Sequence, residues 1–174
     1  MHESRVVNAV VAAVAAVTLA SCGGSKAGKT ASTAAPAPAS TPATIALTSP
    51  AFAPNATIPT RYTCTGAGDS PPLAWSGVPA HAAFLTLLVT DPDAPSGPFV
   101  HWTVSGIPAR VRKLAPNAVP AGARQSANSA GKPGWTPPCP PPGSGRHHYV
   151  FTLTARTAGG APIAVGRLVG RFGR

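Results

Sequence analysis

Phe84-Leu85-Thr86-Leu87-Leu88-Val89-Thr90 is a nearly continuous apolar run, and it passes directly into the turn sequence Asp91-Pro92-Asp93-Ala94-Pro95. A run of this length that ends in β-branched residues is typical of a buried strand, because buried helices are usually longer. Pro92 fixes its own φ and has no N–H to donate, so it ends the strand in a rigid turn. The sequence therefore predicts a strand at residues 84–90 with two carboxylates at its end.

The rest of the chain also favours strands. Residues 99–104 form a second apolar run, residues 149–154 alternate with Tyr149 on the same face as Phe151, and a last strand is expected at residues 166–172. The 22 prolines and 18 glycines disfavour long helices, and no segment has a convincing helical pattern. Residues 114–138 have little periodicity, and a loop of that length is usually functional or poorly ordered. The sequence predicts a mainly β domain.

The N-terminus has the features of an export signal. Arg5 precedes an apolar stretch at residues 6–20, which is long enough for a secretory signal but too short to span a membrane. The stretch ends in Leu19-Ala20-Ser21-Cys22, which resembles a bacterial lipobox. We therefore predict a signal peptide at residues 1–21 and acylation of Cys22, with the domain held on the extracytoplasmic side of the cell membrane. The alternative is an ordinary cleaved signal followed by a chance cysteine.

The region after Cys22 has the composition of a linker. Residues 23–45 contain almost only Gly, Ser, Ala, Thr and Pro with two lysines, and they include no aromatic residue. Such a segment cannot bury a core, so we predict a disordered tether at residues 22–46 and a single folded domain at residues 47–174.

The charge of the chain indicates the class of partner. The formal net charge is +10, which favours anionic partners such as lipid headgroups, acidic polymers and phosphates. The basic residues are scattered singly and do not form a run with interleaved aromatic residues, so nucleic acid is not the expected partner.

Polar groups that could form a site are few. Of the four acidic residues, Glu3 lies in the predicted signal, and the others are Asp69, Asp91 and Asp93. Asp91 and Asp93 either cap amides of the turn or face a pocket, where one of them could bind a ligand or help to place a histidine. His101 lies in the predicted strand at residues 99–104, and His147 has the parity of Tyr149 at the start of another. Carboxylates and histidines near strand ends are a candidate polar site.

Other chemistry is less well supported. A metal could be held by His101, His147 and Asp91, but the sequence has no closely spaced ligand pair, and we predict no metal and no cofactor. There is no Gly-x-Ser-x-Gly elbow and no Gly-rich phosphate loop. Cys64 and Cys139 either form a disulfide, as an even pair does most simply outside the cytoplasm, or remain as buried thiols.

Five motifs occur in order along the chain. The motifs are Ser49-Pro50-Ala51-Phe52, the segment from Ile58 to Gly66, the segment from Asp69 to Trp75, Asp91-Pro92-Asp93-Ala94-Pro95 with His101-Trp102, and Pro138-Cys139-Pro140-Pro141 with His147-His148-Tyr149. Together they resemble those of the phosphatidylethanolamine-binding protein family, in its bacterial branch of Raf-kinase-inhibitor-like proteins. The resemblance covers roughly residues 47 to 174.

The resemblance implies an antiparallel β fold with a small anion pocket that accepts phosphate-type groups or a phospholipid headgroup. The pocket residues it implies are Asp91, Asp93, Ala94, Pro95, His101, His147 and Tyr149, with Pro138 to Pro141 as a wall. We expect a binding protein and not an enzyme, because no activated nucleophile is evident. The alternatives are an inhibitor or modulator of another protein and, less favoured, a hydrolase that uses an Asp–His pair. The oligomeric state is left open.

The chain departs from the family pattern in two places. Relatives carry Gly-Tyr-x-Gly-Pro before the Cys-Pro-Pro motif, whereas this chain has Gly134-Trp135-Thr136-Pro137-Pro138, so Pro137 removes a backbone N–H. Relatives also have a helix between the Tyr149 strand and the terminal segment, and that helix is expected to be deleted here.

Overall fold

The computed structural model describes residues 43–174 of the chain. The predicted signal peptide, Cys22 and most of the predicted tether lie outside the described residues. No helix within the described part is long and apolar enough to cross a membrane.

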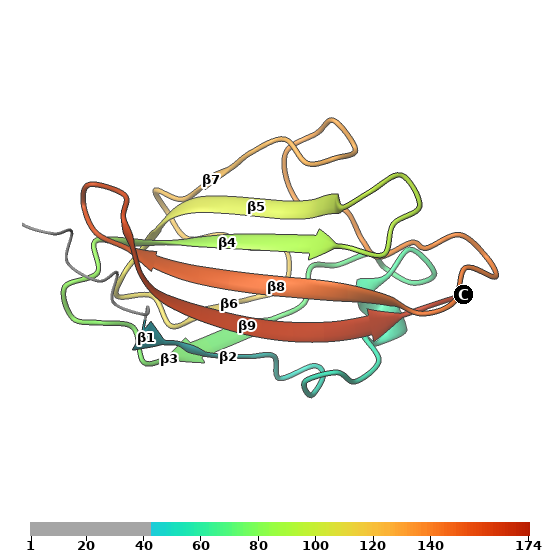
Figure 1. Cartoon of the computed structure of the whole chain (residues 1–174), viewed down its shortest axis with the longest axis horizontal. Coiled ribbons are helices and arrows are strands. Elements are labelled where there is room, and N and C mark those ends of the chain that lie inside the picture. Colours follow the sequence, from blue (N-terminus) through green and yellow to red (C-terminus); the bar gives the residue numbers. More distant parts are fainter. Residues whose placement is uncertain (1–42) are drawn as a thin grey trace, which may run out of the picture. The chain divides into compact units, whose positions relative to one another are not determined.

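The domain is built on a six-stranded sheet in the order β1-β9-β8-β4-β5-β7 (Figure 1). All neighbouring strands are antiparallel except β1 and β9, which are parallel. The strands are β1 (Ala43–Thr44), β4 (Phe84–Asp91), β5 (Phe99–Pro108), β7 (Arg124–Gln125), β8 (His147–Arg156) and β9 (Pro162–Phe172).

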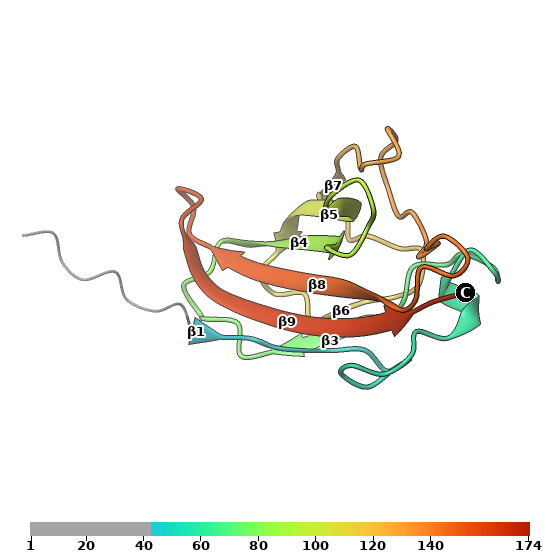
Figure 2. The same ribbon diagram turned by 45° about the vertical axis from the view of Figure 1, so that its right-hand side comes forward.

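A smaller sheet of three antiparallel strands, in the order β2-β3-β6, packs on one face of the large sheet (Figures 1 and 2). Its strands are β2 (Ala46–Thr48), β3 (Leu73–Ser76) and β6 (Lys113–Leu114), and the short 3-10 helix η1 (Thr60–Tyr62) lies between β2 and β3 in the chain. Apolar side chains of the two sheets form one core, which includes Trp75, Leu87, Trp102 and Phe151.

Alternation along β8 shows how the core is made. Every second residue from His147 to Ala155 is buried, whereas the residues between them are partly exposed. Successive side chains of a strand point to opposite faces, so one face of the sheet carries the core. His147 shares the buried face with Tyr149, and the start of β8 therefore places an imidazole inside the domain.

The mainly β fold that the sequence predicts is confirmed, and the predicted strands are present with longer bounds. The strand expected at residues 84–90 ends at Asp91, and the one expected at residues 149–154 begins at His147 and ends at Arg156. β8 and β9 are joined directly by a turn at residues 157–161, so no helix lies between them. The segment at residues 114–138 contains the two-residue strand β7, which pairs with β5.

The predicted end of the tether at residue 46 is too late in the chain. Ala43 and Thr44 pair with β9, and Ile45 is buried in the core with its N–H donated to Val165 at 2.9 Å. The chain crosses β9 at Gly166, where an added Cβ would lie 2.6 Å from the Ile45 carbonyl oxygen. Composition did not predict the strand at residues 43–44, because Ile45 is a single large apolar residue among small ones.

Candidate functional site

A cavity of about 180 Å³ lies where β4 ends and where β5 and β8 begin. Antiparallel pairing brings these three strand ends to one edge of the sheet. The polar residues of the lining are Asp91, His101, Thr136 and His147, and the others are Ala94, Pro95, Phe99, Pro137, Cys139, Pro140 and Pro141. Among residues 43–174, no lysine or arginine lines the cavity, so the cationic groups that this part of the chain can offer there are the two histidines.

Asp91, His147 and Ser144 form a hydrogen-bonded chain. Nδ1 of His147 lies 2.7 Å from Oδ2 of Asp91, and both side chains are buried. Nε2 of the same ring lies 3.0 Å from Oγ of Ser144, while this hydroxyl donates to the Pro141 carbonyl at 2.8 Å. An ionised carboxylate and a carbonyl only accept, and the hydroxyl has one proton. This arrangement is satisfied when both nitrogens of His147 carry a proton and Asp91 carries the balancing charge.

His101 is the other imidazole of the cavity and is also buried. Its Nδ1 donates to the Thr136 carbonyl at 2.7 Å, and the Thr136 N–H donates back to the His101 carbonyl at 2.9 Å. Nε2 has no hydrogen-bond partner among residues 43–174. Burial lowers the pKa of His101, and the contact with Thr136 and the charge of Asp91 only partly oppose this. A neutral His101 therefore presents the lone pair of Nε2, and protonation would turn that atom into a donor.

Asp93 is directed to His148 and not into the cavity. Its Oδ2 accepts from the backbone N–H of His148 at 2.7 Å and from the ring Nδ1 at 2.8 Å. These hydrogen bonds, led by the backbone one, hold the pKa of Asp93 below its usual value. The Asp93 N–H in turn donates to Oδ1 of Asp91 at 2.9 Å. Of the two carboxylates in the turn, Asp93 fixes the start of β8 and Asp91 faces the cavity.

Two other residues that the resemblance implied do not line the cavity. Pro138 is buried behind the wall, and its carbonyl accepts from the N–H of Cys64 at 3.0 Å. Tyr149 is fully buried, its ring meets His101 edge to face at 5.1 Å, and its hydroxyl has no partner in the described structure. Burial, followed by the charges of Asp91 and Asp93, raises the pKa of this phenol. Tyr149 supports His101 from behind, whereas Pro95, Asp91, His101 and His147 reach the cavity itself.

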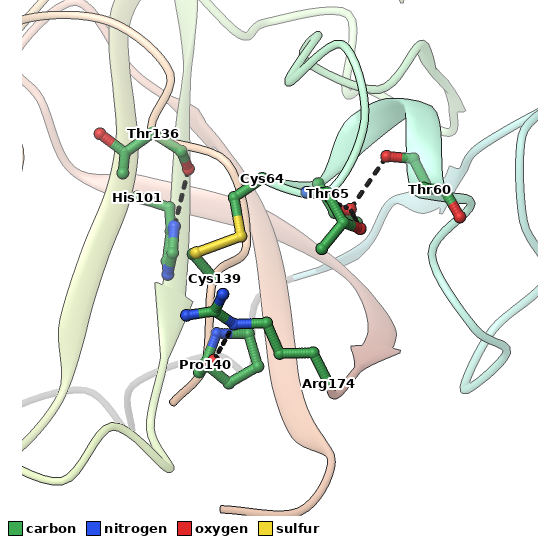
Figure 3. Close-up of a disulfide and its surroundings, with 9 residues drawn as sticks. Thr60, Cys64, Thr65, His101, Thr136, Cys139, Pro140 and Arg174 are labelled. Atoms are coloured by element: carbon green, nitrogen blue, oxygen red, sulfur yellow. Dashed lines mark hydrogen bonds between the residues drawn. A yellow bond between two sulfur atoms is a disulfide. The ribbon is translucent and has the colours of Figure 1, made fainter. Parts of the chain in front are cut away.

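The wall of the cavity is fixed by a disulfide. The Sγ atoms of Cys64 and Cys139 are joined at 2.12 Å, and this links the loop after η1 to the Pro-rich segment (Figure 3). Figure 3 shows the disulfide beside His101 and Thr136. Arg174 donates from Nε to the Pro140 carbonyl at 2.6 Å and holds the same segment from the other side. Prolines at 137, 140 and 141 have no N–H, so this wall offers few backbone donors.

Sequence reasoning missed three residues of the site. Phe99 could have been found, because it is two positions before His101 in the same strand and the two rings lie 4.7 Å apart. Thr136 and Ser144 lie in loops, where no periodicity gives the direction of a side chain. Within the described part of the chain, no group of three His, Cys, Asp or Glu residues is close enough to hold a metal ion.

Comparison with known proteins matches residues 48–167 to the family model described as "Phosphatidylethanolamine-binding protein". This chain belongs to the phosphatidylethanolamine-binding protein family. It is similar to "Putative lipoprotein LppC" of Mycobacterium tuberculosis, with 51% identity over 112 residues that make up 64% of this chain and 54% of LppC. It is also similar to UPF0098 protein Rv1910c of the same species, with 50% identity over 63% of this chain and 52% of that protein. The chain spans about half the length of these curated relatives.

Solved structures of the phosphatidylethanolamine-binding protein family have the same fold. The homologue CT736 from Chlamydia trachomatis matches with a TM-score of 0.69 and 36% identity, over 75% of this chain and 98% of that one. Escherichia coli YbcL, described as a member of the mammalian family, matches with a TM-score of 0.71 and 29% identity, over 76% of this chain and 99% of that one.

Proposed function

We propose that this protein is a lipid-anchored, extracytoplasmic member of the phosphatidylethanolamine-binding protein family that binds a small anionic ligand. The ligand is of phosphate type, either free or as a phospholipid headgroup. The observation that carries the proposal is Nε2 of His101, which has no hydrogen-bond partner among residues 43–174 and borders a mostly apolar cavity beside the Asp91–His147 pair.

The charges around the cavity determine which protonation state of the ligand is bound. Asp91 and His147 compensate each other, and no lysine or arginine lines the site. A fully ionised phosphate would meet the Nε2 lone pair of a neutral His101, which repels it. A hydrogen phosphate group can donate its own proton to Nε2, or His101 can take up a proton when the ligand binds. Binding of a phosphate monoester is therefore coupled to proton uptake near neutral pH.

The anchor is supported by sequence and by one relative. Cys22 follows Leu19-Ala20-Ser21 at the end of the apolar stretch, and LppC carries the word lipoprotein in its name. Acylation would keep a domain that binds phosphate-type groups close to phospholipid headgroups. The region that this chain shares with LppC makes up about half of the length of LppC, and the proposal concerns that region.

The alternative function is a hydrolase, and the geometry indicates which residues would be its catalytic groups. Ser144, His147 and Asp91 are connected in the order nucleophile, base and carboxylate. The Ser144 hydroxyl, however, donates to the Pro141 carbonyl, which leaves His147 as a donor and not as a base. Treatment of the full chain with a fluorophosphonate separates the two functions, since only an activated Ser144 would be labelled.

The binding function is tested by calorimetry on the full chain with phosphoethanolamine and with inorganic phosphate. Titrations at pH 5.5 and 7.5, in buffers of different ionisation enthalpy, measure the affinity and the number of protons taken up. We expect His101→Gln to weaken binding at least about tenfold, the loss of one charge-assisted hydrogen bond. His81→Gln is the matched control, because His81 is exposed and far from the lining. No binding by folded protein at millimolar ligand would overturn the proposal.

A further inference from the structure

A second cavity, of about 260 Å³, lies beside the first and has a different chemistry. Consecutive residues of β5 belong to different cavities, since His101 lines the first and Trp102 lines the second. Within the described part of the chain, no Asp, Glu, Lys, Arg or His lines the second cavity. Its residues are Gly68, Ser70, Trp102, Asn117, Val119, Gln125, Gly134 and Trp135.

The polar groups of the second cavity have hydrogen-bonding capacity that the protein does not use. Gln125 accepts from Trp102 Nε1 at 2.6 Å, but its amide N–H groups have no partner among residues 43–174. The Ser70 hydroxyl accepts from the Asn117 N–H at 2.8 Å, and its own proton has no acceptor within the described part of the chain. Two indoles stand beside these groups, with Trp102 and Trp135 edge to face at 5.8 Å.

We propose that this cavity is a binding site for a neutral, polyhydroxylated ring, such as one sugar unit. The partly exposed indole of Trp135 can pack against the C–H groups of such a ring, and the buried Trp102 lies behind it. The amide and hydroxyl side chains of the lining can exchange hydrogen bonds with the hydroxyls of the ring. A charged ligand would find no counter-ion in the lining. The volume lies just under the range of roughly 300–1,000 Å³ that is usual for drug-sized ligands, which suits a single ring.

Two glycines with a left-handed backbone conformation line the cavity. Gly134 has φ +102°, and an added Cβ would lie 3.7 Å from Oε1 of Gln125. Gly68 has φ +73°, and its Cβ would meet the Pro137 ring at 3.5 Å. Both distances are ordinary van der Waals contacts, so a side chain is unfavourable at these positions because of the left-handed backbone conformation.

The segment at residues 134–137 separates the two cavities. Trp135 lines the second, whereas Thr136 lines the first and accepts from His101. Asn128 holds the segment through the Gly134 carbonyl and the Thr136 hydroxyl, both at 2.9 Å. Nε1 of Trp135 has no partner in the described structure. The rings of Trp135 and His101 lie 6.2 Å apart, so a ligand bound against Trp135 would lie close to the first cavity.

The three tryptophans of the chain provide the test. The full chain carrying Cys22→Ser is labelled with ¹⁵N and titrated with glucose and, separately, with maltotriose. We expect saturable shifts of the indole N–H signals of Trp102 and Trp135 at millimolar sugar. The Trp75 signal is the internal control, because its Nε1 donates to the Val111 carbonyl away from the cavity. Shifts with both sugars mean that the end of a glycan is accepted, and shifts with glucose alone mean that only the free sugar fits.

Two variants locate the binding. Val119→Phe fills the cavity and should abolish the shifts. Gln125→Ala removes the free amide from an exposed position together with the acceptor of Trp102 Nε1, so its affinity is read from the Trp135 signal. It should weaken binding at least about fivefold, whereas Ser126→Ala, its exposed neighbour, should leave binding unchanged. The proposal is overturned if neither sugar moves the signals at 100 mM, if Gln125→Ala binds like Ser126→Ala, or if inorganic phosphate competes with glucose for the same shifts.

Discussion

His147 Nδ1 and Asp91 Oδ2 lie 2.7 Å apart although 56 residues separate them in the sequence, and both side chains are buried. Loss of either partner leaves an uncompensated buried charge, which typically costs about 3–5 kcal/mol. We therefore expect Asp91→Ala and His147→Ala each to destabilise the domain by that amount in urea unfolding. Asp93→Ala, which breaks the half-exposed contact with the His148 ring, is the comparison and should cost clearly less. Equal losses for Asp91→Ala and Asp93→Ala would contradict the distinction.

The pKa of His101 gives a direction for the pH dependence of both stability and binding. Burial lowers this pKa below its ordinary value of 6.5, so the unfolded chain takes up a proton at a higher pH than the folded one. The contribution of neutral His101 to stability is thus present above about pH 6.5 and is lost as the pH falls below it. A phosphate-type ligand should reverse the trend, because its affinity rises as His101 becomes protonated. Urea unfolding from pH 7.5 to 5, with and without phosphate, checks both signs against His101→Gln.

A Tyr149→Phe variant tests whether the Tyr149 hydroxyl contributes to ligand binding or only to the structure. Its hydroxyl is buried without a partner in the described structure, and an unsatisfied polar group of this kind costs about 1–3 kcal/mol. We expect Tyr149→Phe to keep or raise the free energy of unfolding, and to leave the affinity for phosphoethanolamine unchanged. A loss of affinity of tenfold or more would show that the hydroxyl reaches the ligand, as the family resemblance implies.

The Cys64–Cys139 disulfide closes a loop with a sequence separation of 75 residues. In the chain-entropy model, a loop of this size stabilises the folded state by about 4 kcal/mol. We expect thiol titration of denatured, unreduced Cys22→Ser protein to detect no free thiol, and Cys64→Ala/Cys139→Ala to lose several kcal/mol. Since Cys139 lines the first cavity, the double variant should also bind phosphoethanolamine more weakly. Two titratable thiols would favour the alternative of unpaired cysteines.

Acylation at Cys22 concerns the part of the chain outside the described residues. Protein extracted from membranes should begin at Cys22 and carry the added mass of a diacylglycerol. Cys22→Ala should move the protein from the membrane fraction to the soluble fraction. If the variant stays in the membrane to the same extent, the lipobox interpretation is wrong.

The strands were predictable because burial imposes a period of two on residues such as Tyr149, Phe151 and Leu153. The ends were less predictable. β8 continues to Arg156 and β9 begins at Pro162, where pairing of the two strands overrides a segment rich in Gly and Ala. Ile45 was assigned to the tether because its partner β9 is more than 110 residues away in the sequence, and local composition gives no information on that pairing.

The site was predictable only where a strand fixes the direction of a side chain. Asp91, His101 and His147 stand at strand ends, and the structure brings all three to one cavity. Asp93 was grouped with them because it shares the turn, but hydrogen bonds to His148 direct its carboxylate away. The partner of His147 at Nε2 could not be foreseen, because Ser144 is placed by the turn after Pro141, and that turn has no periodic pattern.

The direct turn between β8 and β9 lies at the opposite end of β8 from His147 (Figure 1). With ten residues in β8, the separation is about 30 Å at roughly 3.3 Å per residue. The turn is closed by its own contacts, including the Gly160 N–H to the Thr157 carbonyl at 2.9 Å. A peptide tag or a fluorescent reporter inserted between Gly159 and Gly160 should therefore leave both cavities intact. The position gives a place to immobilise or image the protein in cells without blocking either ligand.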